Sequence, residues 1–183
     1  MREVYTIYMK ELADGVIAVI PTDTIYGIVT SAWNKESVER VYQLKGRNPE
    51  KPCIILISST EQMKDFGVTD EYIQKVSLYK SEGPTSFIVP ITRTDLTYLD
   101  RGTRTLAFRI PQNIPENETV RTILEESGPL IAPSANTEGN PPATAIDEAK
   151  EYFGNSVSKY INGGTITGSP SALIDIKTGT RLR

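Results

Sequence analysis

Histidine is absent from the 183-residue chain, and cysteine occurs once, as Cys53. Without histidine there can be no Ser-His-Asp triad, no imidazole general base and no histidine-ligated metal site. A single cysteine excludes an internal disulfide and a thiolate zinc site, and its place in an apolar run predicts a core residue. Any catalysis must therefore use lysine, arginine, hydroxyls, carboxylates, backbone groups or an ion held by a ligand, so we expect no protein metal site.

Long hydrophobic runs are also missing. No apolar stretch approaches the roughly 20 residues that a membrane span needs, and the N-terminus does not resemble a signal peptide. We therefore expect a cytoplasmic protein with no membrane partner. Lys and Arg number 20 against 23 Asp and Glu, for a formal net charge of −3, which argues against a dedicated nucleic-acid module.

The cations that are present are unevenly spaced. Eight of the 20 form three groups, namely Lys45, Arg47 and Lys51; Arg101, Arg104 and Arg109; and Arg181 and Arg183. Local positive patches on an acidic protein suit a compact anionic ligand better than a long polyanion.

Short apolar runs alternate with segments of helical periodicity, a pattern that predicts an α/β fold. No internal repeat or long linker divides the chain, so we expect one domain over residues 1–183. The periodicity predicts helices around 5–12, 38–45, 70–80, 119–126 and 145–153, and strands at 16–20, 53–57, 87–89, 105–110, 130–132 and 172–176.

The stretch PTDTIYG, residues 21–27, directly follows the apolar run at 16–20. It places three hydroxyls and a carboxylate where a plain turn would suffice. Ligands of α/β sheets collect beyond the carboxyl ends of strands. The stretch therefore predicts a cradle for a small polar substrate such as an amino acid.

The segment KGRNPEKP, residues 45–52, places three cations at a helix end and on a turn stiffened by two prolines. Ordering a flexible lysine costs side-chain entropy, so a stiff turn favours the capture of an anion such as triphosphate. Taken alone, a Lys-x-Arg turn is more often an ordinary solvated basic turn.

Strand alternation at 105–110 places Thr105 and Arg109 on one face, about 13 Å apart. That separation is too long to grip one phosphate and suits two parts of an elongated site, with arginine as a fork for a carboxylate. A surface strand with one exposed arginine is an equally good interpretation of the stretch alone.

A second apolar strand, at 130–132, ends in the small polar segment PSANTEGNPP, residues 133–142. This segment and PTDTIYG would deliver hydroxyl and amide groups to the same rim of the sheet. A turn with a helix cap is the simpler interpretation. The glycine-rich stretch at 163–171 contains no Walker pattern, so a nucleotide would have to bind in another way.

The order of these motifs closely resembles the YrdC/TsaC family, the threonylcarbamoyl-AMP synthases. The motifs are PTDTIYG, KGR with a lysine four residues on, GPTS, LAFRIP, PSAN with Gly and Pro-Pro, and GG and PS before the last apolar strand. The match runs from about Val16 to the C-terminus and resembles the short, single-domain form. It implies an open, twisted mixed sheet with flanking helices around a large concave, positively lined cavity.

The resemblance implies a nucleotidyltransferase that makes threonylcarbamoyl-AMP and pyrophosphate from L-threonine, bicarbonate and ATP. Mg²⁺ would be held mainly by the nucleotide. The product would feed the threonylcarbamoyl modification of adenosine in tRNA, so transient contact with the tRNA threonylcarbamoyl-transfer machinery is expected. Both reacting partners are anions, so neutralising charge and holding geometry are the main demands, and a chain without histidine can meet them.

The resemblance also assigns roles by matching motif. The catalytic set comprises Lys45, Arg47, Lys51 and Asn136. The expected threonine contacts are Thr24, Leu56, Arg109, Ala132 and Ser171. The expected ATP contacts are Arg47, Lys51, Thr105, Ser134, Pro142 and Arg183.

The chain departs from the family pattern at Ser81-Glu82-Gly83-Pro84, where Trp-Pro-Gly-Pro is usual, which affects local pocket shape. The YciO-like branch tends to lack the intact Lys-x-Arg and Ser-x-Asn pairs; their presence here favours a synthase. The main alternative is a double-stranded RNA- or tRNA-binding module without synthase activity, and weak RNA binding is compatible with the basic groups. A carbamoyl-transfer domain of the hydrogenase-maturation type normally belongs to a much longer chain.

Overall fold

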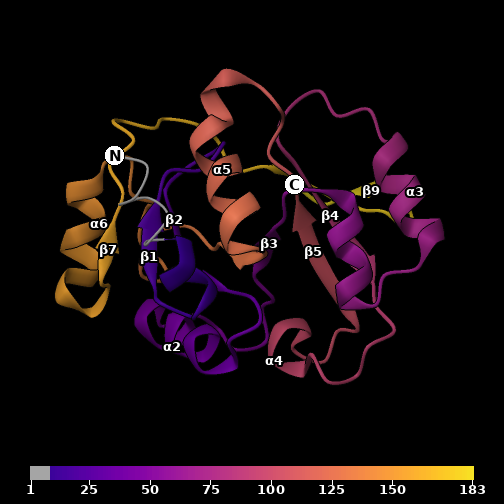
Figure 1. Ribbon diagram of the computed structural model, residues 1–183, viewed down its shortest axis with the longest axis horizontal. Coiled ribbons are helices and arrows are strands. Elements are labelled where there is room, and N and C mark those ends of the chain that lie inside the picture. Colours follow the sequence, from indigo (N-terminus) through magenta and orange to yellow (C-terminus); the bar gives the residue numbers. More distant parts are fainter. Residues whose placement is uncertain (1–8) are drawn as a thin grey trace.

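The computed structural model describes residues 9–183, which form a mixed β-sheet with helices packed against it (Figure 1). The nine described strands follow the order β7-β1-β2-β6-β3-β5-β4-β8-β9. Pairs β3–β5, β4–β8 and β1–β7 are parallel and the other neighbouring pairs are antiparallel. The predicted α/β fold with a mixed sheet is confirmed.

The elements have the following bounds. The strands are β1 (Ala18–Ile20), β2 (Gly27–Ser31), β3 (Ile54–Leu56), β4 (Thr85–Pro90), β5 (Thr105–Arg109), β6 (Leu130–Ile131), β7 (Lys159–Tyr160), β8 (Ala172–Asp175) and β9 (Thr180–Arg181). The helices are α2 (Lys35–Lys45), α3 (Asp70–Leu78), α4 (Thr97–Asp100), α5 (Glu118–Ser127) and α6 (Ile146–Phe153), with 3₁₀ turns η1 (Thr60–Phe66), η2 (Pro115–Asn117) and η3 (Gly154–Ser156).

Helix α2 shows how local sequence positions a functional residue. The Asn34 side chain accepts a hydrogen bond from the Ser37 amide at 2.9 Å and so caps the first turn. Val38 and Val41 bury one stripe of the helix, and Gly46 ends it with a left-handed φ of 59°. Lys45 is the last residue of the buried stripe, as the periodicity predicted, so its side chain points inward.

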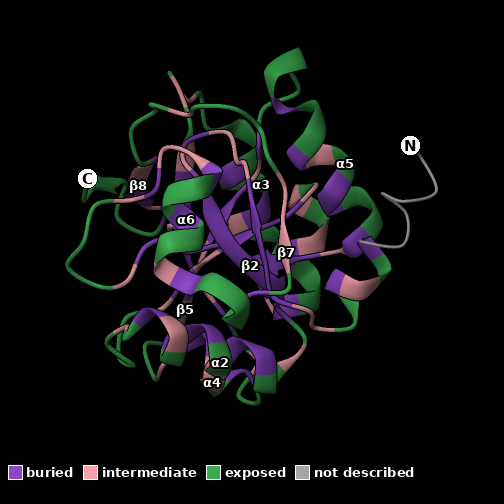
Figure 2. Ribbon diagram, turned by 90° about the vertical axis from the view of Figure 1, so that its left-hand side faces the viewer, coloured by how far each residue is buried: buried purple, intermediate pink, exposed green. Residues whose placement is uncertain are grey.

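Strand alternation divides the core between the two faces of the sheet. Ile55 and Phe108 belong to the larger cluster, together with residues of α2 and α6, whereas Leu56 packs in a second cluster with residues of α5. Figure 2 shows the buried strands inside and exposed outer faces on α2, α5 and α6. Helix α5 contributes to the core on the same face that carries Arg109, the register partner of Leu56.

Most predicted elements are confirmed within a few residues. The first strand is shorter than expected, because the Val16 amide bonds Glu11 O of the preceding helical turn and pairing begins only at Ala18. Residues 9–13 are helical, and the predicted start of that helix lies outside the described residues. Strand β2 was not predicted, because all five of its residues are buried and no alternation marks it. Within residues 9–183, no helix combines the length and apolarity that crossing a membrane requires.

Candidate active site

Two chain segments leave the sheet at the same rim. Strands β1 and β6 both pair antiparallel with β2, so they run in the same direction and end at the same edge. Residues 21–26 follow β1, residues 132–136 follow β6, and a backbone bridge joins Gly27 to Ser134. A cavity of about 390 Å³ opens between these segments, within the size range of small-molecule sites.

The cavity is lined by many of the residues that the motifs identified. They come from segments far apart in the sequence, so the fold has gathered them. Nine of the expected site residues line it: Thr24, Arg47, Thr105, Arg109, Ala132, Ser134, Pro142, Ser171 and Arg183.

Strand β5 forms one wall of the cavity with alternate residues, as the sequence pattern predicted. Thr105, Ala107 and Arg109 line the cavity, while Leu106 and Phe108 are buried on the opposite face. One strand therefore presents a hydroxyl and a guanidinium at the two ends of the same cavity wall.

Arg109 is held by an acidic partner that the motif comparison did not single out. Its Nη2 lies 3.1 Å from Asp23 Oδ1 and also donates to Thr22 Oγ1 at 3.3 Å. The side chains of Arg109 and Asp23 are only 5% and 3% exposed. Burial raises the pKa of the Asp23 carboxyl, while the charge of Arg109 opposes that rise. The sequence signal was available, because Asp23 is the only carboxylate in PTDTIYG.

The hydroxyls of the PTDTIYG stretch form hydrogen bonds within the turn and to the glycine-rich stretch at 163–171. Thr22 Oγ1 donates to Ile25 O at 2.7 Å and lies 3.1 Å from Thr24 Oγ1, so Thr22 braces the turn and holds Thr24. The Tyr26 hydroxyl donates to Gly164 O and accepts from the Gly163 amide, both at 2.8 Å. Tyr26 therefore ties the glycine-rich stretch to the turn.

That tie brings the stretch before β8 against the turn. The Gly168 backbone is so close to Thr24 that an added Cβ would lie 2.2 Å from Thr24 O. Ser171 is buried beyond it, with its Oγ 2.8 Å from Ser86 Oγ, and Ser171 O accepts from Arg183 Nε at 3.0 Å. The glycines thus allow backbone contact that places Ser171 and Arg183 at the cavity.

Lys45 and Asn136 meet behind the cavity wall and do not line it. Lys45 Nζ donates to Ser134 O and Asn136 O, each at 2.5 Å, and to Asn136 Oδ1 at 3.2 Å. The Ser134 hydroxyl donates to Asn136 Oδ1 at 2.5 Å. Burial, followed by the charge of Arg47, lowers the pKa of Lys45 to about 8. These two side chains therefore position Ser134, which faces the cavity.

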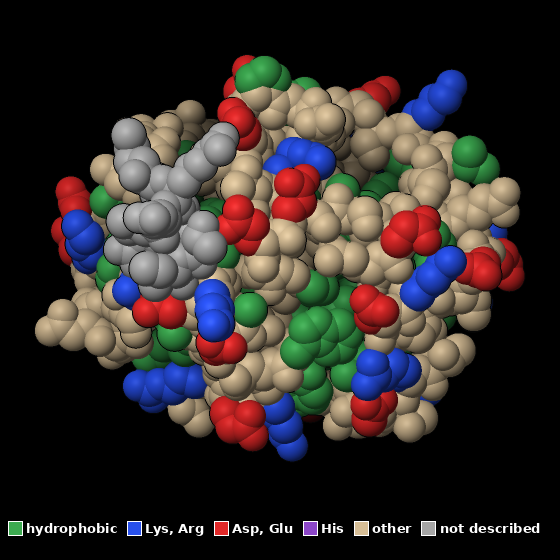
Figure 3. Space-filling model, viewed as in Figure 1, with side chains coloured by type: hydrophobic (Ala, Val, Ile, Leu, Met, Phe, Trp, Pro, Cys, Tyr) green, Lys and Arg blue, Asp and Glu red, His purple; other side chains and the backbone are tan. Residues whose placement is uncertain are grey.

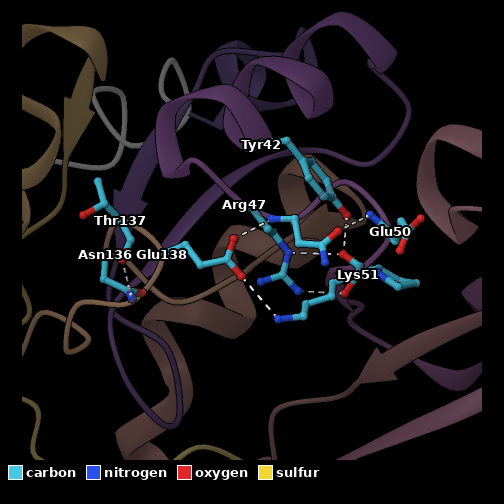
Figure 4. Close-up of polar contacts among 9 residues, drawn as sticks. Tyr42, Arg47, Glu50, Lys51, Asn136, Thr137 and Glu138 are labelled. Carbon is cyan, nitrogen blue, oxygen red and sulfur yellow. Dashed lines mark hydrogen bonds and ion pairs between the residues drawn. The ribbon is translucent and has the colours of Figure 1, made fainter.

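Arg47 and Lys51 share one turn, where Figure 4 shows both side chains near Glu138, but only Arg47 lines the cavity. Arg47 lines the cavity, and its Nε and Nη2 donate to Lys51 O at 3.2 Å and Pro52 O at 3.0 Å. Lys51 Nζ lies 3.3 Å from Glu138 Oε1 and does not line the cavity. The motifs did not identify Glu138.

Leu56 is the remaining expected contact. Its side chain is fully buried in the second core cluster and does not line the cavity, although it is the register partner of Arg109 on the neighbouring strand. Leu56 lies where helix α5 covers the sheet, so its side chain packs in the core.

The described lining contains arginines and hydroxyls but no carboxylate. Within residues 9–183, no cluster of three or more His, Cys, Asp or Glu side chains could hold a metal ion. Such a lining fits a divalent cation that is carried and held by an anionic ligand. Over the face in Figure 3, Lys and Arg are interspersed with Asp and Glu.

The fold and the cavity together define an α/β protein with an arginine- and hydroxyl-lined cavity at one rim of its sheet. More narrowly, the chain belongs to the Sua5/YciO/YrdC family, whose model, described as "Telomere recombination", matches residues 10–183. The family resemblance of the sequence motifs is therefore confirmed.

Individual relatives support the same family assignment. The chain is 32% identical to a threonylcarbamoyl-AMP synthase of Marinobacter nauticus, over 94% of this chain and 90% of the relative. The crystal structure of P. abyssi Sua5 complexed with L-threonine is similar, with a TM-score of 0.81 and 28% identity over 93% of this chain and 50% of that one. This chain thus spans about half the length of that protein. E. coli YciO matches with a TM-score of 0.78 over 96% of this chain and 84% of that one, and its 19% identity shows the fold alone.

Proposed function

We propose that the protein is an L-threonylcarbamoyladenylate synthase, a nucleotidyltransferase that forms threonylcarbamoyl-AMP and pyrophosphate from L-threonine, bicarbonate and ATP. One observation carries the proposal: Arg47, Arg109 and Arg183 converge with threonine and serine hydroxyls on one cavity. The curated relatives that are named for this activity support it.

We assign the amino-acid end of the cavity to the region around Arg109. A guanidinium is the natural fork for the threonine carboxylate, and the buried pairing with Asp23 fixes its orientation. The Thr24 and Ser171 hydroxyls lie on the same lining and can hydrogen-bond the polar groups of the substrate. The relative whose crystal structure is a complex with L-threonine supports threonine as the amino-acid substrate.

We assign the nucleotide to the other part of the lining. Arg47 and Arg183 from the lining, with Lys51 from the turn that follows Arg47, would neutralise phosphate charge. The Thr105 hydroxyl would donate a hydrogen bond, and the Ser134 hydroxyl, which donates to Asn136 Oδ1, would accept one. Mg²⁺ would enter on the triphosphate and be held mainly by it, and it would supply further neutralisation of phosphate charge.

The chemistry requires two steps. The threonine amine and bicarbonate form a carbamate with loss of water. A carbamate oxygen then attacks the α-phosphate of ATP, and the bond to the departing pyrophosphate breaks. Because the carbamate and the triphosphate repel each other, the protein contributes by binding both at fixed positions among cations.

The proposal extends to the setting of the enzyme. We propose that residues 1–183 act as one domain in the cytoplasm, and that the product passes to the tRNA threonylcarbamoyl-transfer machinery. A mixed anhydride of a carbamate and AMP hydrolyses readily, so direct transfer to a consuming enzyme would limit its loss.

Incorporation of radiolabelled bicarbonate into a nucleotide-linked product tests the proposal. We expect incorporation that requires both ATP and L-threonine, and a loss of orders of magnitude in Lys51→Ala. The matched control is Lys35→Ala, which removes an exposed lysine at the start of α2 and should leave the rate unchanged. Equal incorporation with any amino acid would contradict the threonine assignment. Salt-sensitive RNA binding without turnover would favour the RNA-binding alternative.

A further inference from the structure

Glu138 places a carboxylate where the basic turn presents its donors. Glu138 Oε2 accepts a hydrogen bond from the Asn48 amide at 2.5 Å, and Oε1 lies 3.3 Å from Lys51 Nζ (Figure 4). One backbone N–H and one ammonium converging on two oxygens is the arrangement with which proteins bind a phosphate group. The carboxylate therefore occupies an anion-binding arrangement on the turn that follows Arg47.

Glu138 belongs to the segment that also carries Ser134 and Asn136. The Glu138 amide donates to Lys45 O at 2.7 Å, which fixes the backbone of Glu138 at the C-terminal end of α2. The Asn48 amide and Lys51, with Arg47 as a more distant charge, lower the pKa of Glu138, so it carries a full negative charge at neutral pH. The negative charge at this turn is thus built into the protein.

Lys51 is anchored in its backbone and free to move in its side chain. Lys51 O accepts from the Tyr42 hydroxyl at 2.8 Å and from Arg47 Nε at 3.2 Å. The Lys51 side chain is 60% exposed and that of Glu138 35%, so solvent weakens their attraction and the pair can separate. A lysine on this anchor can exchange one anionic partner for another at little cost.

We propose that Glu138 is an internal competitor for the nucleotide phosphates, occupying the Asn48 amide and Lys51 until the triphosphate displaces it. This inference rests on the proposed function, because it assumes that phosphate groups bind at the basic turn. Glu138 keeps Lys51 beside the turn when no nucleotide is bound. It also weakens the hold on pyrophosphate after the reaction, because the carboxylate returns as the product leaves.

The test is direct binding of ATP and of pyrophosphate by titration calorimetry to wild type and Glu138→Gln. Glutamine keeps an oxygen acceptor for the Asn48 amide but removes the charge that holds Lys51. Both ligands should bind about two- to fivefold more tightly, which corresponds to the strength of an exposed charge pair. The KM for ATP should fall by a similar factor, with the KM for L-threonine unchanged.

Two comparisons isolate the effect. Glu50→Gln removes a charge from the same turn and should leave ATP affinity unchanged. The described polar contact of Glu50 is made by its backbone amide, which donates to Asn48 Oδ1, and not by its carboxylate. In a Lys51→Ala background, Glu138→Gln should have a much smaller effect, because the competitor acts through Lys51. Thermal unfolding of each variant would verify that the fold is kept.

ATP binding that is unchanged or weaker in the Glu138 variants would contradict the proposal. If Glu138 only braces the turn, Glu138→Gln and Glu138→Ala would bind ATP more weakly than wild type or with equal affinity, and the competitor role would be overturned. If the wild-type protein makes threonylcarbamoyl-AMP while the variants bind ATP no more tightly, this inference alone fails. If the wild type binds no ATP, the proposed function fails as well.

Discussion

The guanidinium of Arg109 lies 3.1 Å from the carboxylate of Asp23, and both side chains are almost completely buried. Arg109 Nε is also buried and has no hydrogen-bond partner among the described residues. A buried guanidinium is costly unless its donors are paired. Asp23 thus places a carboxylate against the guanidinium of Arg109, a residue that lines the cavity.

Asp23→Asn tests this pairing. The substitution keeps the shape of the side chain but leaves the buried Arg109 charge uncompensated, so the free energy of unfolding should fall by about 3 kcal/mol. The KM for L-threonine should rise at least about tenfold, because Arg109 loses its fixed orientation. Urea denaturation and steady-state kinetics measure the two effects. Asp14→Asn, at an exposed aspartate, should change neither.

The hydrogen bonds of Asn136 support the wall that carries Ser134. Asn136→Ala removes the Oδ1 atom that accepts hydrogen bonds from Lys45 Nζ and from the Ser134 hydroxyl. We therefore expect the free energy of unfolding to fall by about 1–3 kcal/mol and ATP to bind more weakly. Asn140→Ala is the matched control, since it keeps the backbone oxygen that Asn136 Nδ2 contacts. Equal ATP affinity in the two variants would show that the Lys45–Asn136 contact does not position Ser134.

Close backbone packing at Gly168 yields a steric prediction. An added Cβ would lie 2.2 Å from Thr24 O, so Gly168→Ala must push the stretch before β8 away from the turn. Stability should fall by about 1–3 kcal/mol and the KM for L-threonine should rise, because Thr24 and Ser171 separate. Gly83→Ala, where an added Cβ meets nothing within 4 Å, should behave as wild type. A wild-type KM in Gly168→Ala would contradict the predicted contact.

The buried ammonium of Lys45 predicts a pH dependence of stability. Its pKa falls from the usual 10.5 to about 8, so between these values the unfolded chain holds a proton that the folded protein has released. The free energy of unfolding therefore gains from this group as pH rises through that window, by up to about 1.4 kcal/mol per pH unit. Chemical denaturation of wild type and Lys45→Met across the window isolates the contribution. A difference between them that stays constant with pH would show that the pKa is not lowered.

The placement of several expected site residues could be predicted because local periodicity determines the face on which a side chain lies. The strand at 105–109 and the helix ending at Lys45 show this clearly, since periodicity alone placed Arg109 on one face and Lys45 at the end of a buried stripe. The order of motifs then indicated the family.

What the sequence could not predict depends on contacts between distant segments. Asp23 pairs with Arg109 across 86 positions and Glu138 reaches Lys51 across 87, and no local pattern encodes such pairings. The same reason explains why Lys45 and Asn136 support the wall from behind, and why Leu56 is core. Those roles follow from the order of strands in the sheet.

A crystal structure with L-threonine and a non-hydrolysable ATP analogue would test the central claim most directly, that two anionic substrates share one arginine-lined cavity. We predict the threonine carboxylate within hydrogen-bond distance of Arg109, and the phosphates beside Arg47 and Arg183 in the same cavity. A nucleotide bound elsewhere on the surface, with this cavity holding threonine alone or nothing, would contradict the account.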